Sequence, residues 1–230
     1  MNIVITGAAD GLGREIAKEF KNEHLILIDY DKQKLSKVAK ELKAEHYVCD
    51  LAVAQEIESI CKNIESRMDV DILINCAGAW LDEKTETDLK KYQNMILVNL
   101  FAPIAMIKSF LPKFIKKKKG LIININSQSG VERERATGAV YGATKAGLIA
   151  YRQNMKKELG KNGVRMTDIC PGLIETGLFE KAGVNVPDDI FKQYALSKSQ
   201  VVDAIKYIIR QPVDILIPSL ELKNVHENLY

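Results

Sequence analysis

Short apolar runs alternate with longer segments of mixed apolar and polar residues along the chain. The short runs, at 3–5, 25–28, 46–49, 72–74, 121–125, 164–169 and 215–217, have the length and composition of β-strands. They are almost continuously apolar, which is typical of parallel strands covered on both faces. The intervening segments, chiefly 14–20, 32–42, 54–66, 95–114 and 140–159, carry apolar residues at helical spacing. This α/β pattern predicts a Rossmann-like, doubly wound parallel sheet of about seven strands with helices on both faces.

Length and composition favour one globular domain over residues 1–230. Hydrophobic residues make up 47% of the chain and charged residues 27%, an ordinary balance for a folded domain. The segment 172–198 is a long stretch without a clear strand and follows the sixth predicted strand. Because ligands of open α/β sheets bind beyond the carboxyl ends of the strands, we expect this segment to form a lid over a substrate.

Charge and cysteine usage exclude several classes of function. The formal net charge is only +3, and the basic run 116–119 has the position of a helix end before Gly120. We therefore expect no nucleic-acid partner. The four cysteines form no CxxC pair and the three histidines are scattered, so we predict reduced thiols and no metal site. Without a charged leader or an apolar run of transmembrane length, we expect a cytoplasmic protein with no membrane contact.

A glycine-rich turn follows the first strand and precedes an amphipathic helical segment. Its sequence is Thr6-Gly7-Ala8-Ala9-Asp10-Gly11-Leu12-Gly13. Glycines allow a tight strand-to-helix turn and let the backbone and the helix N-terminus approach a pyrophosphate. We predict nucleotide contacts at Gly7, Asp10, Gly11, Leu12 and Gly13. The spacing G-x-x-x-G-x-G resembles that of the short-chain dehydrogenase/reductase family, in its short, non-extended branch.

The second predicted strand ends at Asp29, where a Rossmann fold places the group that binds the adenosine ribose. A carboxylate accepts hydrogen bonds from both ribose hydroxyls and repels a 2′-phosphate. Family members that use NADP commonly carry a basic residue at the position matching Asp10 or Tyr30, and neither is basic here. We therefore expect NAD(H) to be favoured over NADP(H), with Asp29 and Tyr30 at the adenosine.

The resemblance implies further cofactor contacts. Asp50-Leu51 is similar to the family's pair at the adenine, and Asn75-Cys76-Ala77-Gly78 to its Asn-Asn-Ala-Gly signature, with Cys76 replacing the second asparagine. The segment after the sixth strand is similar to the one that holds the nicotinamide carboxamide. The implied contacts are Asp50, Leu51, Asn75, Ala77, Gly78, Pro171, Gly172, Ile174 and Thr176.

Tyr141 and Lys145 stand four residues apart at the start of a predicted helix. This spacing places both side chains on one helix face, with the ammonium beside the phenol. Tyrosine is a poor base at neutral pH, and a nearby cation favours its phenolate. The phenol can then take a proton from an alcohol or give one to a carbonyl. The resemblance also implies that Tyr141 and Lys145 contact the cofactor.

Two more catalytic residues are implied by the resemblance. Ser127 is similar to the serine that hydrogen-bonds the substrate oxygen, and Asn99 to the asparagine that holds a water beside the lysine. Ser127 lies 14 residues before Tyr141 and Ser129 lies 12 before it, so Ser129 is a competing assignment. The position of Gly130 favours Ser127, because the family's usual arrangement is Ser-Ser-x-x-Gly.

The resemblance as a whole implies an NAD(H)-dependent oxidoreductase that interconverts a secondary alcohol and a ketone or aldehyde by hydride transfer. It also implies a homodimer or homotetramer formed through the helices from Met95 and Val140. A non-catalytic, nucleotide-sensing regulatory protein on the same fold is the alternative, although such proteins usually lose the tyrosine or the lysine. An epimerase or dehydratase of the extended branch usually has G-x-x-G-x-x-G and a larger C-terminal domain. The predicted lid 172–198 contains both apolar and charged residues. It indicates an uncharged, partly apolar substrate and leaves the identity of that substrate open.

Overall fold

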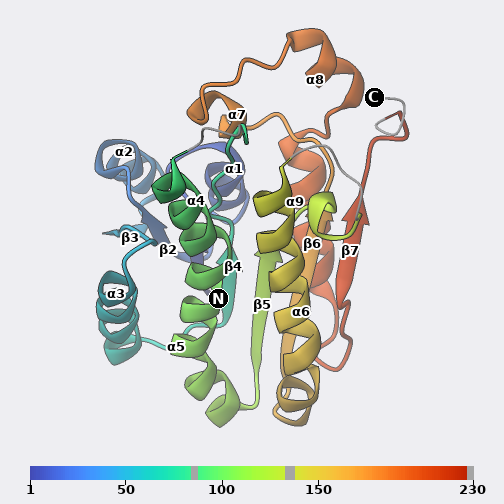
Figure 1. Cartoon of the computed structure of the whole chain (residues 1–230). Helices are drawn as coiled ribbons and strands as arrows, with labels where there is room; N and C mark the ends of the chain where they lie inside the picture. The colour runs from blue at the N-terminus through green and yellow to red at the C-terminus, as the bar shows by residue number, and fades with distance from the viewer. Residues whose placement is uncertain (84–87, 133–137, 227–230) are drawn as a thin grey trace.

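Seven parallel strands form one sheet in the order β3-β2-β1-β4-β5-β6-β7 (Figure 1). The computed structural model describes residues 1–83, 88–132 and 138–226. The strands are β1 (Asn2–Thr6), β2 (His24–Asp29), β3 (Glu45–Val48), β4 (Ile72–Asn75), β5 (Gly120–Ile125), β6 (Val164–Pro171) and β7 (Ser219–Leu222). This topology confirms the predicted doubly wound, Rossmann-like α/β fold.

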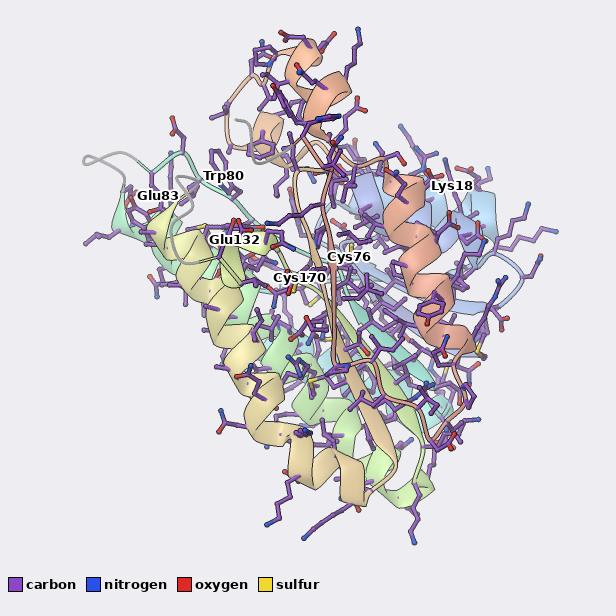
Figure 2. All side chains as sticks on the ribbon, turned by 90° about the vertical axis from the view of Figure 1, so that its right-hand side faces the viewer. Lys18, Cys76, Trp80, Glu83, Glu132 and Cys170 are labelled. Carbon is purple, nitrogen blue, oxygen red and sulfur yellow. The ribbon has the colours of Figure 1, made fainter. Side chains whose placement is uncertain are left out.

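Helices cover both faces of the sheet. In chain order they are α1 (Gly11–Glu19), α2 (Lys32–Leu42), α3 (Ala54–Arg67), α4 (Leu89–Ile96), α5 (Ala102–Lys117), α6 (Ala139–Lys161), α7 (Leu178–Lys181), α8 (Asp188–Tyr194) and α9 (Lys198–Arg210). Helices α1, α2 and α9 pack on one face, and α3, α5 and α6 pack on the other. Figure 2 shows α6 and α9 on opposite sides of the strands.

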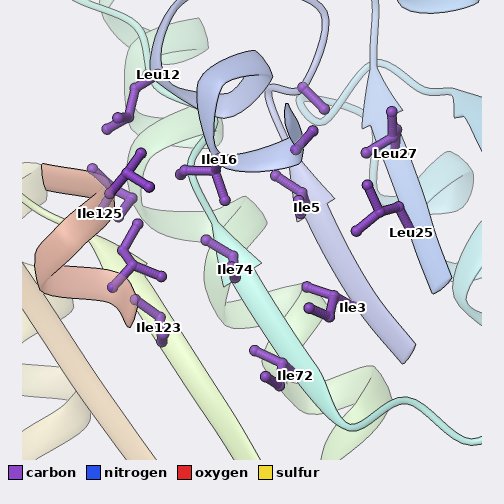
Figure 3. Packing of buried hydrophobic residues seen from close by; sticks show 14 of the residues in the cluster. Ile3, Ile5, Leu12, Ile16, Leu25, Leu27, Ile72, Ile74, Ile123 and Ile125 are labelled. Carbon is purple, nitrogen blue, oxygen red and sulfur yellow. The ribbon is translucent and has the colours of Figure 1, made fainter. Parts of the chain in front are cut away.

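Successive residues of the central strands point to opposite faces and enter two separate cores. Ile3 and Ile5 of β1 pack with Leu12 and Ile16 of α1 (Figure 3), whereas Val4 between them belongs to the core on the other face. Burial of both faces removes apolar surface from water on each side of the sheet. This explains why the strands are continuously apolar in sequence.

The helical segment predicted at 95–114 is longer than expected. Helices α4 and α5 are joined without a break by the π-helical turn η1 (Leu97–Phe101). By length and composition alone, the combined helix Leu89–Lys117 could cross a membrane, so the expectation that no apolar run reaches that length was wrong. In the structure, Met106, Phe110 and Phe114 of α5 are buried against the sheet, which accounts for much of its apolar character.

The last strand lies further along the chain than predicted. The apolar run 215–217 precedes β7, whose ladder with β6 begins at Ser219. Pro218 has no backbone N–H to donate to a ladder. The run before it instead supplies carbonyl acceptors, since Thr167 Oγ1 donates to Ile217 O at 2.8 Å. The prediction of a strand at 215–217 was therefore wrong, because its apolar residues lead into the strand without forming it.

Segment 172–198 contains α7 and α8 and lies beyond the carboxyl ends of the strands (Figure 1). Its two ends are close together, because Ile174 and Leu196 form an isolated parallel β-bridge. The segment thus leaves the sheet after β6 and returns to it at α9.

Candidate active site

A pocket of about 940 Å³ lies at the carboxyl ends of the strands. Strand β1 pairs with both β2 and β4. The strands that follow β1 are therefore added first on one side of it, as β2 and β3, and then on the other side, from β4 onward. Open α/β sheets bind ligands at such a crevice. The pocket is bordered by the turn after β1, the ends of β2 and β5, the start of α6 and segment 172–198.

Most of the residues predicted from sequence line this pocket. They are Gly7, Asp10, Gly11, Leu12, Gly13, Asp29, Tyr30, Asp50, Leu51, Ala77, Gly78, Ser127, Tyr141, Lys145, Pro171, Gly172, Ile174 and Thr176. Asn75 and Asn99 are buried behind the pocket wall and are not among its lining residues.

The turn after β1 packs tightly against the backbone of its own chain. Gly7 has φ +68°, and a Cβ there would lie 2.7 Å from Ala77 Cα. A Cβ on Gly13 would lie 2.1 Å from the carbonyl oxygen of Gly7. Only glycine fits at these two positions. Helix α1 begins at Gly11, so the positive end of its dipole faces the pocket. The turn therefore fits a dinucleotide pyrophosphate.

Asp29 is buried at the end of β2, and its carboxylate is held by the backbone. One oxygen accepts from Ala9 N at 3.0 Å and the other from Asp31 N at 3.0 Å. Each carboxylate oxygen can accept about two hydrogen bonds, so both keep capacity for a ligand hydroxyl. Tyr30 beside it is largely exposed, with 66% of its surface accessible. The pair suits an adenosine ribose and its base.

Asp10 lies between two lysines that sequence reasoning did not connect to it. Lys34 Nζ of α2 lies 3.1 Å from one oxygen, and Lys181 Nζ of α7 lies 2.9 Å from the other. Partial burial alone would raise the pKa of Asp10, but hydrogen bonds and charge from Lys181 and Lys34 lower it below its usual value. The Lys181 pair also ties segment 172–198 to the glycine-rich turn.

Tyr141 and Lys145 lie side by side on the pocket wall. The Lys145 ammonium is 5.6 Å from the centre of the Tyr141 ring and donates a hydrogen bond to Ile125 O at 3.1 Å. Lys145 is almost fully buried, with 4% of its surface exposed. The carbonyl at the end of β5 therefore fixes the ammonium beside the phenol, as the i, i+4 spacing predicts.

Ser127 and Ser129 both line the pocket. Ser127 follows β5 in extended conformation, and its Oγ accepts from Ser129 N at 3.1 Å. Its backbone N–H donates to Asn126 Oδ1 at 3.0 Å, which fixes the backbone of Ser127. The structure thus brings both candidate serines to the same wall as Tyr141.

Asn99 lies on the π-helical turn η1, buried next to Ala79. Its Oδ1 accepts from Ala79 N at 2.7 Å, and its Nδ2 donates to Ala79 O at 2.8 Å and to Thr144 Oγ1 at 3.3 Å. The side chain is therefore engaged with the backbone that follows Gly78. Asn99 Oδ1 and Lys145 Nζ both approach Gly78, where a Cβ would lie 3.7 Å and 4.0 Å from them.

The sequence model of the short chain dehydrogenase family matches residues 1–186 of this chain. The chain belongs to that family. It is 32% identical over 228 residues to an uncharacterized oxidoreductase of Staphylococcus epidermidis, with 96% of each chain covered. The family makes the protein an oxidoreductase with a nicotinamide cofactor.

Solved structures of other dehydrogenases superpose on nearly the whole of this short-chain dehydrogenase. The closed form of a serine dehydrogenase complexed with NADP⁺ has a TM-score of 0.88 at 26% identity, covering 98% of this chain and 95% of that one. An alcohol dehydrogenase of the archaeon Thermococcus sibiricus, complexed with 5-hydroxy-NADP, has a TM-score of 0.85 at 26% identity, covering 98% and 97%.

Asn75 of this short-chain dehydrogenase belongs to a buried row of hydrogen bonds across the sheet. Its Nδ2 donates to Asn124 Oδ1 at 2.9 Å, and Asn124 Nδ2 donates to Asp168 Oδ1 at 2.9 Å. Arg152 Nε of α6 completes the row, 2.6 Å from Asp168 Oδ2. Burial raises the pKa of Asp168, while Asn124 and Arg152 oppose that shift. Asn75 therefore supports the pocket from behind, and sequence reasoning found neither Asp168 nor Arg152.

Cys76, which replaces an asparagine of the family signature, lines the pocket as a free thiol. Burial raises the pKa of the Cys76 thiol to about 12. The group is therefore protonated at neutral pH, which makes it a poor nucleophile.

Part of the pocket lining, including Trp80 and Phe179, is aromatic and aliphatic. Trp80 packs edge-on against Phe179 of α7 with ring centres 4.8 Å apart, and Phe179 lies 6.4 Å from Phe191 of α8. The other apolar residues of this part of the lining are Leu81, Val98, Leu173, Leu178, Val186 and Ile190. Segment 172–198 therefore faces the pocket with apolar side chains.

Proposed function

We propose that this short-chain dehydrogenase is an NAD(H)-dependent enzyme that interconverts a secondary alcohol and the corresponding ketone, or a primary alcohol and the corresponding aldehyde. The observation that carries the proposal is the Tyr141–Lys145 pair, fixed by Ile125 O on the wall of a pocket that also contains the glycine-rich turn. Hydride transfer between an alcohol and a carbonyl requires at least a bound nicotinamide and a group that moves a proton, and this pocket offers residues for both.

In the proposed mechanism, Tyr141 is the general acid and base. During reduction the phenol donates its proton to the substrate oxygen, and during oxidation the phenolate takes the proton of the alcohol. Lys145 stabilises the phenolate by its charge. The Ser127 hydroxyl donates a hydrogen bond to the substrate oxygen and stabilises the charge that develops there. When bound, the nicotinamide supplies or accepts the hydride.

The remaining predicted residues hold the cofactor and the pocket wall. The glycine-rich turn would bind the pyrophosphate, and Asp50 and Leu51 the adenine. Ala77, Gly78, Pro171, Gly172, Ile174 and Thr176 would hold the rest of the cofactor. Asn99 acts through its hydrogen bonds to Ala79. Ser129 remains the alternative to Ser127, and comparing the two alanine variants would decide between them.

A preference for NAD(H) is supported by the Asp29 carboxylate at the adenosine end. Asp29 keeps acceptor capacity toward the pocket, and Asp10 is a second carboxylate on the same lining. Asp29 would repel a 2′-phosphate, whereas the charge of Asp10 is offset by its ion pairs with Lys34 and Lys181, so the preference rests on Asp29. The two solved dehydrogenases described above hold NADP or an NADP derivative, so the cofactor preference of this chain would differ from theirs.

Segment 172–198 is proposed as the lid over the substrate. Its Phe179 meets Trp80 across the pocket, and its Lys181 meets Asp10 on the cofactor side. Among the described lining residues, the charged ones are Asp10, Asp29, Asp50, Lys145 and Lys181. The aromatic end is therefore suited to an uncharged, partly apolar substrate.

The proposal is tested by NADH and NADPH binding, followed by turnover of a panel of acetophenone, cyclohexanone, 2-octanone and their alcohols. The Tyr141→Phe variant is expected to lose turnover by a factor of at least about 10² while binding NADH as the wild type does. Turnover close to wild type in that variant would remove Tyr141 from the mechanism. NADH binding without turnover of any alcohol or ketone would favour a nucleotide-sensing regulator.

A further inference from the structure

Among the described residues next to its N-terminus, the helix that carries Tyr141 has no side-chain cap of its own. Helix α6 begins at Ala139, its N-cap residue Gly138 makes no side-chain cap bond, and its first turn contains no acidic residue. The first backbone N–H groups of a helix have no partner within the helix, and they carry its positive dipole end. An acceptor from another part of the chain can therefore bind the first turn of α6, which contains Tyr141.

Glu83 supplies that acceptor from the connection between β4 and α4. Its Oε1 accepts from Val140 N at 2.9 Å and from Tyr141 N at 3.1 Å, and its Oε2 lies 3.2 Å from Val140 N. The partners are 57 and 58 residues apart in sequence. Figure 2 shows Glu83 beside the N-terminal end of α6, on the same side as Trp80. One carboxylate thus binds the backbone N–H of Tyr141 itself.

Gly138 provides the space for this contact. It has φ +101°, and a Cβ built on it would lie 2.7 Å from Glu83 Oε1. A side chain at this position would push the carboxylate away from the helix. Glycine at position 138 cannot cap the helix with a side chain, and it leaves the space that the Glu83 carboxylate occupies.

The same contact ties the wall of the substrate pocket to α6. The chain before Glu83 is fixed at Ala79 by Asn99 and then contributes Trp80 and Leu81 to the pocket lining. Glu83 is not itself among the described lining residues of the pocket. Its hydrogen bonds set the distance between this wall and the Tyr141 backbone.

We propose that Glu83 is a positioning residue for Tyr141, acting through its hydrogen bonds to the first turn of α6. The inference rests on the proposed role of Tyr141 in catalysis. Small displacements of a catalytic group cost large factors in rate, because proton transfer requires close contact with the substrate oxygen. Loss of Glu83 therefore lowers kcat while leaving the cofactor site intact.

Three substitutions separate the reach of the side chain from its charge. Glu83→Gln keeps the length and one oxygen that can accept both N–H groups, whereas Glu83→Asp keeps the charge and shortens the reach. Glu83→Ala removes both. The matched control is Asp88→Ala, because Asp88 caps α4 by accepting from Lys90 N at 2.9 Å and lies in the same connection. Each variant is compared in amide hydrogen exchange, melting temperature, NADH affinity and steady-state turnover of the panel ketone that the wild type reduces fastest.

Faster amide exchange at residues 139–145 is expected in the Asp and Ala variants, with near wild-type exchange in the Gln variant. kcat should fall about tenfold or more in the Asp and Ala variants and by less than about twofold in Gln, with NADH affinity unchanged in all of them. Asp88→Ala should lower the melting temperature without changing kcat.

Two results would overturn the inference. One is wild-type kcat in Glu83→Ala at temperatures where it is folded, and the other is a Gln variant as impaired as the Ala variant. Tyr141→Phe separates this failure from that of the proposed function: if it is inactive while Glu83→Ala is fully active, only the role of Glu83 is lost. If Tyr141→Phe is fully active, the proposed function fails whatever Glu83 does.

Discussion

The carboxylate of Asp29 holds two parts of the pocket together. Its backbone partners Ala9 and Asp31 lie on the turn after β1 and on the chain after β2, so it joins two sides of the pocket. A buried carboxylate is stable only when its oxygens are hydrogen-bonded. These two bonds orient the carboxylate in advance, which would lower the entropic cost of binding the ribose in the proposed function.

Replacing Asp29 by alanine together with Tyr30 by arginine is expected to raise NADPH affinity relative to NADH about tenfold or more. The change removes a repulsive carboxylate and adds a cation for the 2′-phosphate, and a tenfold change corresponds to about 1.4 kcal/mol. Dissociation constants for both nucleotides, measured by fluorescence, give the ratio.

The control is Asp31→Ala, which removes a neighbouring carboxylate that is not part of the described pocket lining. Its NADPH to NADH ratio should stay that of the wild type. An unchanged ratio in the double variant would show that the preference is set elsewhere.

At the scale of elements, α7 is held over the pocket by few contacts. It is a short helix without a buried residue, and its links include the Trp80–Phe179 ring contact and the Asp10–Lys181 ion pair. Short elements with little buried apolar surface open at low free-energy cost. Such an element can admit and release a cofactor while the sheet remains folded.

The Asp10→Asn variant is expected to lower the free energy of unfolding at neutral pH by about 0.5 kcal/mol, because partly exposed ion pairs are screened by solvent. The pKa of Asp10 is lowered below its usual value of 3.8, so this stabilisation is fully present above about pH 5. It is lost as the pH falls through the lowered pKa. Urea unfolding of both proteins between about pH 7 and pH 3 measures the difference.

The difference between wild type and variant should stay constant above about pH 5 and shrink toward the acid end. The Lys181→Met variant should show the same dependence, since it removes the partner on α7. A difference that grows as the pH falls would contradict this account of the pair.

At the scale of the whole molecule, apolar side chains remain exposed along the long helix Leu89–Lys117. Ile96 and Phe101 have 41% and 39% of their surfaces accessible. Grouped exposed apolar residues on one element indicate a contact surface more often than isolated ones do. Members of the short-chain dehydrogenase family are commonly oligomers, and a homodimer or homotetramer formed through this helix stays a prediction for this chain.

Light scattering at micromolar concentration is expected to give two or four times the subunit mass of 25.8 kDa. Ile96→Glu should lower that mass by placing a charge in the contact surface. Tyr207→Glu, on the exposed face of α9, is the control and should leave it unchanged. A single-subunit mass for the wild type would disprove the assembly.

Patterns within a few residues of each other were sufficient to predict much of this protein. The position of Lys145 four residues after Tyr141 places both on one face of any helix, and the glycines after β1 allow few other turns. The prediction of a strand at 215–217 was wrong because the apolar pattern does not show where pairing begins. The ladder with β6 begins only after Pro218, at Ser219. Continuous apolar runs in the other strands were predictable, since burial on both faces leaves no polar position.

The sequence alone therefore determined the order of strands and helices along the chain, the glycine-rich turn after β1 and the placing of Tyr141 beside Lys145, because each depends on local spacing. Tertiary structure decided which distant groups meet. Glu83 reaches the N-terminus of α6 across 58 residues, and Lys181 reaches Asp10 across 171. The residues next to Glu83 and Asp10 in sequence do not indicate these partners, because an ion pair or a helix cap depends on distance in space. That distance is set only when the sheet brings the carboxyl ends of its strands together.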